Sequence, residues 1–395
     1  MAEPIDTRST RSPAQIAQDV AAELAKSAAA RDAVGGTPKR ERDLLRDSGL
    51  LTLVIPRALG GWGASWLETF DVVRSIARVD GSLGHVFGFQ HLLLATLQLF
   101  GSEAQWRPWF EATARERWFW GNALNPLDPR TRLVWNGEVG RIDGDKSFCS
   151  GALDSDMLVV SAIEAQTEKL IVAALPTARR GITLGHDWDN MGQRQTDSGS
   201  AHFEAVSVLR SELLATPGPL GSTFASLRPC IAQLSLSNVY LGLAYGALDA
   251  ARSYTSGQSR AWFLSGAAHP SEDPYVLRHY GELWVELEAA RLVTDEAARA
   301  LDRAWQRGDE LTPAQRAAAA IAIATAKAKT TRVSLETTSR VFEVMGARAT
   351  TAKARVDRFW RNARTHTLHD PVDYKLRDIG AYVLADRPPT PSFYS

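Results

Sequence analysis

The residues best suited to acid–base chemistry lie near the end of the chain, in Thr365-His366-Thr367-Leu368-His369-Asp370. Two imidazoles three residues apart share one face of a helix, and imidazole gains and loses its proton near neutral pH. His366 and His369 are therefore candidates for donating a hydrogen bond or a proton to a reacting group, although either could instead cap a helix end. Metal binding would need a third ligand at a recognisable spacing, and none occurs, so we expect no metal site.

A second candidate pair is Phe148 and Ser150, within Asp145-Lys146-Ser147-Phe148-Cys149-Ser150-Gly151. Residues two apart in a strand point to the same face, which would place an aromatic ring beside a hydroxyl that both donates and accepts. The alternative is that Phe148 fills the core and Ser150 satisfies a turn. Taken alone, the pair leaves both interpretations open.

Several classes of function lack their sequence signals. The 45 acidic and 45 basic residues balance at zero formal charge, which disfavours nucleic acid and anionic membranes as partners. No G-x-G-x-x-G, P-loop or G-x-S-x-G motif occurs, and no Glu precedes a His by three residues as in di-iron helical oxygenases. The two cysteines are too few for a disulfide framework. With neither a signal-peptide core nor a stretch of about twenty apolar residues, the chain is expected in the cytoplasm.

The periodicity of apolar residues predicts the elements that must position these candidates. It is helical before residue 110, period two between about 118 and 214, and helical again in segments near 222–257, 273–307 and 313–346. The fold predicted is mainly α with a central β domain. We expect a helical domain over 1–116, a β domain over 117–218 and a helical bundle with a tail over 219–395.

Four separated segments give this order a family likeness. They resemble the acyl-CoA dehydrogenase superfamily, whose layout is an N-terminal helical domain, a β-barrel-like middle domain and a C-terminal four-helix bundle. The segments are Ile55-Pro56 with Gly60-Gly61-Trp62-Gly63, Asp145–Gly151, Met191-Gly192-Gln193-Arg194 through Phe203, and Arg358–Arg364.

Longer matches point to one branch of that superfamily. Asp80-Gly81-Ser82-Leu83-Gly84-His85, Arg194–Ser200 and Phe359–Pro371 resemble the flavin monooxygenases typified by dibenzothiophene monooxygenase. The resemblance implies a homotetramer that takes reduced FMN, with FAD as the alternative, from a separate NAD(P)H-dependent flavin reductase. It also implies that a flavin C4a-hydroperoxide formed with oxygen converts an aromatic sulfide to sulfoxide and sulfone.

Two departures disfavour acyl-CoA dehydrogenation. Asn122-Ala123-Leu124-Asn125-Pro126 replaces the segment that dehydrogenases place before the flavin, and Asp370 stands where they carry a catalytic Glu. Hydroxylation or N-oxygenation of another aromatic molecule is the alternative activity, and a helical scaffold that has lost its flavin is the non-enzymatic one.

The resemblance also assigns roles to single residues. It gives His369 the hydrogen bond to the oxygenated flavin and His366 a supporting role, and it lets Arg260 reach the flavin phosphate of a neighbouring subunit. The remaining flavin contacts that it implies are Asn122, Phe148, Ser150, Trp188, Thr196 and Gly346, with core packing as the alternative for Trp188, a solvated surface for Arg260 and helix capping for Gly346.

The substrate side is less well defined. An ungapped match places Gln90 where the branch has an active-site histidine, and the adjacent His91 is about a hundred degrees away on the helix. Either side chain could enter the pocket, and His91 could also be a packing residue. Phe89 and Trp262 could hold a planar ligand. No charged cluster for a carboxylate or phosphate substrate is visible, which favours a neutral one.

Overall fold

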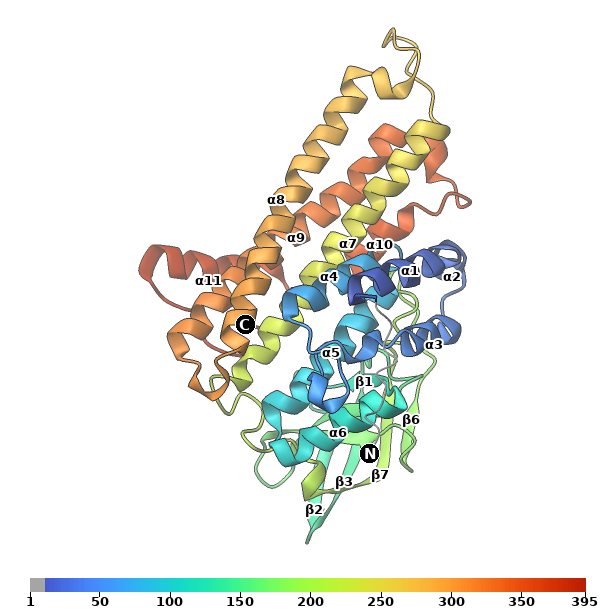
Figure 1. The fold of residues 1–395 in the computed structure, drawn as a ribbon. Coiled ribbons are helices and arrows are strands. Elements are labelled where there is room, and N and C mark those ends of the chain that lie inside the picture. Colours follow the sequence, from blue (N-terminus) through green and yellow to red (C-terminus); the bar gives the residue numbers. More distant parts are fainter. Residues whose placement is uncertain (1–10) are drawn as a thin grey trace, which may run out of the picture.

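The computed structural model describes residues 11–395 and shows helices, then a sheet, then helices again (Figure 1). This order confirms the predicted fold of a mainly α protein with a central β domain. The N-terminal stretch without signal-peptide features lies partly in residues 1–10, outside the described residues. The helices before the sheet are α1 (Pro13–Ala25), α2 (Ala28–Val34), α3 (Lys39–Asp47), α4 (Trp66–Ala77), α5 (Gly81–Phe100) and α6 (Glu103–Glu116).

Helix α5 forms the centre of the N-terminal part. Asp80 begins the helix by accepting a hydrogen bond from the Leu83 amide at 3.0 Å. By length and composition α5 could cross a membrane, contrary to the expectation that no such segment occurs. However, 94% of its apolar window is buried inside the protein, so α5 is a core helix on which other elements pack.

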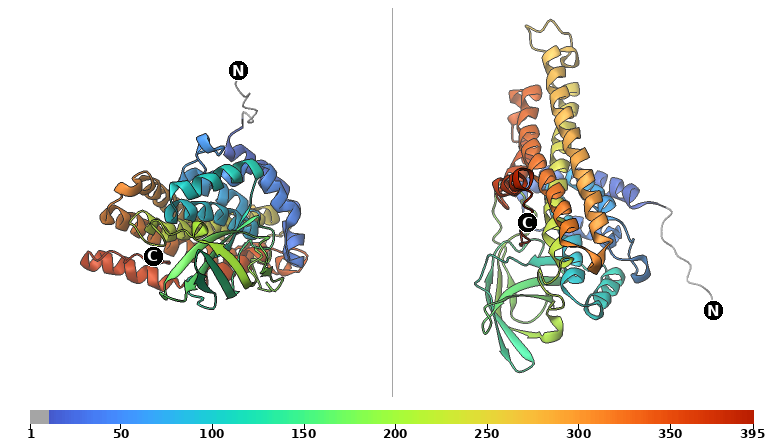
Figure 2. Two further views of the ribbon diagram at one scale, coloured as in Figure 1. Left: turned by 90° about the horizontal axis from the view of Figure 1, so that it is seen from below. Right: turned by 90° about the vertical axis from the view of Figure 1, so that its left-hand side faces the viewer.

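The middle of the chain forms one curved sheet. Its order is β1-β4-β2-β3-β7-β6, with β5 paired to β4. Strand β7 alternates buried and exposed residues, so one face of the sheet covers an apolar cluster. Figure 2 shows the sheet at one end of the molecule, below the helices. The strands are β1 (Trp120–Ala123), β2 (Arg132–Asn136), β3 (Val139–Lys146), β4 (Met157–Glu164), β5 (Leu170–Pro176), β6 (Ile182–Leu184) and β7 (Ala201–Leu209).

Long helices form the C-terminal part. Asp273 and Thr312 cap α8 and α9 through their side chains, each followed by a proline in the first turn. Helix α9 packs on α7, α8 and α11, while α10 crosses α7 and α9. The far ends of α7 and α8 project away from the rest of the molecule (Figure 1). These helices are α7 (Arg228–Gly257), α8 (Pro274–Trp305), α9 (Pro313–Met345), α10 (Asp357–His366) and α11 (Val372–Ala385).

Candidate active site

A tight turn after β3 presents Phe148 and Ser150. Phe148 adopts a left-handed backbone with φ of 61°. Its side chain is 61% exposed and meets the edge of the Trp188 ring at 6.1 Å between centroids. The expectation that both residues lie on one face of a strand is wrong, because the left-handed residue ends the alternation. Phe148 therefore offers an open aromatic surface, while Ser150 is buried.

Three hydroxyls form a chain that starts at Ser150. Its Oγ lies 2.7 Å from Oγ of Ser198, which lies 2.7 Å from Oγ1 of Thr196. Thr196 donates to the carbonyl of Gln193 at 3.0 Å. Since each hydroxyl has one proton, Ser198 must donate to Thr196 and Ser150 to Ser198. The Ser150 oxygen is left as an acceptor for a ligand.

Buried Arg42 of α3 fixes this turn against the N-terminal helices. It donates to the Gly151 carbonyl at 2.9 Å and pairs with Asp197 at 3.2 Å. The main-chain N–H of Asn122 in β1 also holds the turn, because it donates to the Ser150 carbonyl at 2.9 Å. The predicted flavin contacts at Asn122, Ser150 and Thr196 therefore lie together on a rigid frame.

Two imidazoles meet where α5 packs near α10. The rings of His85 and His366 are 4.6 Å apart and perpendicular, and Phe89 lies 4.1 Å from His85. Both ring nitrogens of His366 are buried and lack a hydrogen-bond partner. Burial, followed by the nearby His85 and His369, lowers the pKa of His366 well below its usual value, and burial lowers that of His85 to about 3. Both rings are neutral at pH 7.

His369 is held by an ionic network rather than by apolar packing. Its Nδ1 lies 3.1 Å from a carboxylate oxygen of Asp370, and buried Lys327 of α9 lies 3.3 Å from the same oxygen. Burial would raise the pKa of Asp370, but Lys327 and His369 hold it well below its ordinary range. The ionised carboxylate accepts a hydrogen bond from Nδ1 of His369, which leaves Nε2 free to exchange a proton with a ligand.

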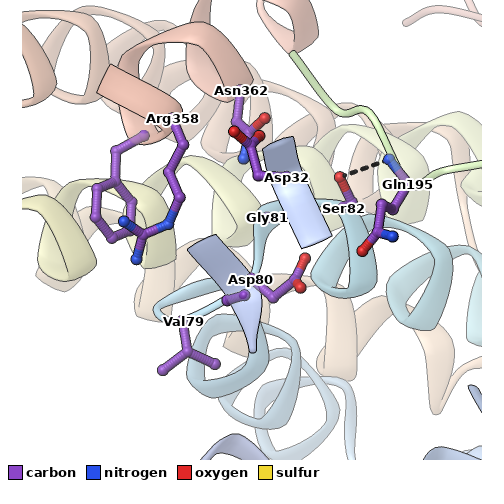
Figure 3. Close-up of a pocket in the computed structure, with 10 residues that line it drawn as sticks. Asp32, Val79, Asp80, Gly81, Ser82, Gln195, Arg358 and Asn362 are labelled. Atoms are coloured by element: carbon purple, nitrogen blue, oxygen red, sulfur yellow. Dashed lines mark hydrogen bonds between the residues drawn. The ribbon is translucent and has the colours of Figure 1, made fainter. Parts of the chain in front are cut away.

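The hydroxyl chain and the imidazoles border one region. The main-chain amide of Gln193 donates to the side-chain oxygen of Asn362 in α10 at 2.6 Å. The main-chain amide of Gln195 donates to the hydroxyl of Ser82 in α5 at 3.3 Å. Figure 3 shows Ser82, Gln195 and Asn362 around a cavity at this junction. Its volume of about 10 Å³ is room for a single water. The junction is therefore a packed joint that sets the distance between α10 and the β domain.

Gln90 and His91 do not join this region. The side-chain amide of Gln90 is fully buried and bonds only to main chain. Its nitrogen donates to the carbonyls of Leu51 and Trp118, and its oxygen accepts from the main-chain N–H of Trp120. Of the two alternatives that the sequence leaves open, Gln90 as a donor in the pocket is not what the structure shows, because its side chain bonds to main chain. His91 packs edge-on against Phe87 at 4.8 Å, about 160° around the helix from Phe89.

Arg260 and Trp262 lie at the distal tip of the bundle, between α7 and α8 (Figure 1). Both are exposed, with Trp262 at 64%. Within one chain neither is brought to His369, so the expected contact of Trp262 with substrate does not form inside a single subunit. Gly346 ends α9 with φ of 78° and donates to the Phe342 carbonyl at 2.8 Å, which is the helix-capping arrangement.

His85 and Ser198 are not among the residues predicted from the sequence, although both stand inside the motifs that carry the resemblance. His85 and Phe89 are four residues apart, the spacing that places side chains on one helix face. Ser198 is two residues from Thr196. Both spacings can be seen in the sequence. They indicate a site only when the fold brings His366 of α10 to His85 and Ser150 of the turn to Ser198.

Two family descriptions match the chain. Residues 12–117 match "Acyl-CoA dehydrogenase, N-terminal domain", and residues 234–374 match "Acyl-CoA dehydrogenase, C-terminal domain". Together they span both helical parts and cover more than half of the chain.

Individual proteins resemble it over almost its full length. The probable FMNH2-dependent monooxygenase SfnC of Pseudomonas putida is 58% identical, with 96% of each chain covered. The structure of the methanesulfinate monooxygenase MsuC from Pseudomonas fluorescens superposes with a TM-score of 0.96 at 56% identity, covering 98% of this chain and 100% of that one. The FMN-bound dibenzothiophene monooxygenase TdsC from Paenibacillus sp. A11-2 gives a TM-score of 0.93 at 42% identity, covering 97% and 99%.

Proposed function

The chain belongs to the acyl-CoA dehydrogenase family, and on this premise we propose that its site uses reduced FMN and oxygen to oxygenate an organosulfur compound at sulfur. It is a flavin-dependent monooxygenase and hence an oxidoreductase, as are its close relatives. The observation that carries the proposal is a buried hydroxyl acceptor at Ser150 and an unpartnered neutral imidazole at His366, on segments that the hydrogen bond from Gln193 to Asn362 joins.

The residues present fit a reduced flavin. Reduced flavin carries an N–H at its central ring, and the Ser150 oxygen is left as an acceptor by the hydroxyl chain. The open Phe148 ring and the neighbouring Trp188 offer aromatic surface to a planar ring. Thr196 and Asn122 border the same turn, so the donors, acceptors and aromatic surface lie within one rigid frame.

Reduced FMN, when bound, supplies the two electrons that activate oxygen for transfer of one atom to sulfur. The role of the protein is to orient the reactants and to manage protons. Asp370 accepts a hydrogen bond from Nδ1 of His369, so Nε2 can accept a proton and, once it carries that proton, can donate it to the oxygen that leaves as water.

The surroundings of His366 exclude water. His85, Phe89 and His366 are buried, and the His366 nitrogens meet no protein partner. A dry, neutral surface strengthens the few hydrogen bonds made to the reacting groups and slows wasteful reaction with solvent. His366 therefore supports the reaction by shielding it and by offering one donor and one acceptor.

The same geometry disfavours acyl-CoA dehydrogenation. A dehydrogenase needs a carboxylate that abstracts a proton from the substrate, but Asp370 is engaged by Lys327 at 3.3 Å and by His369 at 3.1 Å. Its pKa is held low, which makes it a weak base. Asp370 instead serves as the partner that orients His369.

The relatives differ in the sulfur compound that they oxidise. TdsC acts on dibenzothiophene and has also been solved with indole, whereas MsuC acts on methanesulfinate. Oxygen transfer to sulfur is common to both activities. We propose that the substrate is an organosulfur compound. The candidates are the aromatic sulfide predicted from the sequence and an alkanesulfinate.

We also propose a flavin reductase as a partner, because a family member that uses reduced FMN must receive it already reduced. A homotetramer is proposed because Arg260 and Trp262 lie far from the site of their own chain, where they could serve only a neighbouring subunit. The proposed location is the cytoplasm, since Cys149 and Cys230 are free thiols.

A single-turnover reaction tests the function. Protein and reduced FMN are mixed with ¹⁸O-labelled oxygen and either dibenzothiophene, methanesulfinate or indole, and the products are analysed by mass. Incorporation of one labelled atom per sulfur oxidation supports the proposal. Oxygenated indole without any sulfur product would move the chain to the aromatic alternative, and reduction of its flavin by an acyl-CoA without any product would overturn monooxygenation.

A further inference from the structure

One lysine inside the C-terminal bundle contacts two side chains that lead to the site. Lys327 of α9 has a side chain that is 1% exposed. Its Nζ donates to the hydroxyl of Tyr240 in α7 at 3.2 Å and to a carboxylate oxygen of Asp370 at 3.3 Å. An apolar side chain of similar size would fill this position without the cost of removing a charge from water. Packing alone therefore does not account for a lysine here.

The first of these contacts leads to His369. Nδ1 of His369 lies 3.1 Å from Oδ1 of Asp370, which is the same oxygen that Lys327 contacts. The other oxygen, Oδ2, lies 3.8 Å from Nζ of Lys375 and makes no hydrogen bond within residues 11–395. Among the cations of the described residues, Lys327 is thus the one that hydrogen-bonds to this carboxylate, and it compensates the charge of Asp370 at the oxygen that His369 uses.

The second contact leads to His366. The Tyr240 hydroxyl donates to the main-chain carbonyl of His366 at 2.9 Å, and the two rings meet edge-on with 5.5 Å between their centroids. Because a hydroxyl has one proton and Tyr240 donates it to this carbonyl, its oxygen must accept from Lys327. Lys327 therefore fixes the direction of the hydrogen bond that holds the last residue of α10.

The charge of Lys327 also decides which nitrogen of His369 carries the proton. An ionised Asp370 can only accept, so Nδ1 must carry the proton and Nε2 stays open. Burial raises the pKa of Asp370, whereas Lys327 lowers it. Without Lys327 the buried carboxyl would take up a proton and would donate to Nδ1. The proton of the imidazole would then lie on Nε2, which could no longer accept one.

We propose that Lys327 is a positioning residue for both imidazoles of the site: it holds His369 in the tautomer with an open Nε2 by way of Asp370, and it fixes His366 by way of Tyr240. The inference rests on the proposed function and adds Tyr240 and His366 to the network that holds His369. The sequence does not reveal this network, because Lys327 lies 43 residues from Asp370 and 87 residues from Tyr240.

The tautomer of His369 provides a test that does not depend on activity. The full-length protein is prepared with ¹⁵N-labelled histidine, and its ring nitrogens are observed by NMR at pH 7, with His369→Gln to assign the signals. The unchanged protein should carry the His369 proton on Nδ1. Lys327→Met should move it to Nε2, whereas Lys327→Arg, which keeps the charge, should leave it on Nδ1. The same tautomer in Lys327→Met and in the unchanged protein would overturn the proposal.

The pH dependence of oxygenation provides a second test. Lys327→Met should lower product formed per flavin oxidised by about a hundredfold near pH 6, the usual minimum value of acid–base assistance. The loss should shrink toward about pH 9, because Asp370 then ionises in the variant and because burial lowers the pKa of Lys327 itself to about 8. The other titratable groups that face this pair or the two imidazoles are His85, Tyr240, Lys375 and Tyr394.

The matched control is Lys329→Met, which removes the same charge from the same helix at a position where the lysine pairs with Glu286. It should leave product per flavin oxidised unchanged at every pH. The KM for the sulfur compound should change little in Lys327→Met, since a positioning residue acts on the reaction rather than on binding. A loss of equal size at every pH would mean that Lys327 acts only through packing, and this would overturn the proposal.

Two outcomes separate this proposal from the proposed function. If Lys327→Met does not fold, the unchanged protein still decides the matter, because a His369 proton on Nε2 would refute the role of Lys327. If the unchanged protein oxygenates no sulfur compound while Lys327→Met still moves the His369 proton, the proposed function fails and the control of the tautomer by Lys327 stands.

Discussion

His85 and His91 are six residues apart on α5 and meet opposite surroundings. His85 contacts the ring of His366, whereas His91 contacts Phe87 and has no hydrogen-bond partner at either nitrogen. Because six residues correspond to about 600° of rotation, the two side chains point about 120° apart and meet different neighbours. We therefore propose that His85 borders the site and that His91 belongs to the core.

Replacing each imidazole by leucine separates these roles. His85→Leu should lower product formed per flavin oxidised by about a hundredfold, as expected when a polar group beside the reacting atoms is removed. His91→Leu should leave that ratio unchanged. The measurement is product and hydrogen peroxide per turnover, and uncoupling by His91→Leu alone would return His91 to the active site.

The hydroxyl chain makes a prediction about the redox state of the flavin. Removing the Thr196 hydroxyl frees the proton of Ser198 to point toward Ser150, which then becomes a donor. Since only the reduced flavin ring donates at its central N–H, Thr196→Val should weaken binding of reduced FMN relative to oxidised FMN by about tenfold, the value of one hydrogen bond. Anaerobic titrations of both forms check it, and an unchanged ratio would contradict the assigned donor order.

At the scale of elements, Gly192 controls how closely α10 approaches the β domain. A Cβ on Gly192 would lie 2.1 Å from the Arg361 carbonyl oxygen and 2.7 Å from the Asn362 amide nitrogen. Both clashing atoms are main chain, so α10 would have to move, and it carries His366. The imidazole would then shift relative to Ser150.

Gly192→Ala should therefore destabilise the protein by about 1–3 kcal/mol, the usual cost of overpacking, and should also lower oxygenation. Gly380→Ala in α11 is the matched control, because its Cβ would meet no atom within 4 Å. There the same change should stabilise the helix by about 0.5–1 kcal/mol. Thermal unfolding and product yield measure both, and equal behaviour of the two variants would refute the role of Gly192.

The elements were more predictable than their contacts. Apolar periodicity predicts the long helices because burial on one side imposes a 3.6-residue repeat, and the strands because the pleat imposes a repeat of two. The sequence predicts a strand at Phe148-Cys149-Ser150, because no residue there indicates that Phe148 adopts a left-handed backbone. The sequence predicts Gln90 and His91 rather than His85 because an ungapped match places Gln90 where the related branch has its active-site histidine. Which face of α5 meets the site depends on segments distant in the sequence, such as the turn whose Gln195 amide bonds to Ser82.

For the whole molecule, apolar surface on the projecting bundle indicates assembly. Leu277, Trp284 and Leu292 of α8 are more than half exposed and recur at steps of seven and eight residues. The tip adds Trp262, Phe263 and Leu264, each more than 60% exposed. Exposed apolar surface of this extent usually marks a protein interface, which supports the proposed homotetramer.

Trp284→Glu should therefore lower the mass measured by light scattering, because a buried charge in an apolar interface lacks a partner. If Arg260 binds the flavin of a neighbouring subunit, the affinity for FMN should fall together with the measured mass. The control is Arg303→Gln, at an exposed polar position of the same helix, which should leave the mass unchanged. A monomeric unchanged protein would refute the assembly.

The acid stability of the molecule depends on the buried imidazoles. Burial lowers the pKa of His91 to about 3, whereas in the unfolded chain a histidine titrates near 6.5. Between these values the unfolded chain binds the additional proton, so the free energy of unfolding decreases as the pH falls, by up to about 1.4 kcal/mol per pH unit for each such group. His91→Leu removes one of these groups. Denaturant unfolding at several pH values below 6.5 should give a shallower decrease for His91→Leu, and parallel curves would mean that His91 gains its proton in the folded protein.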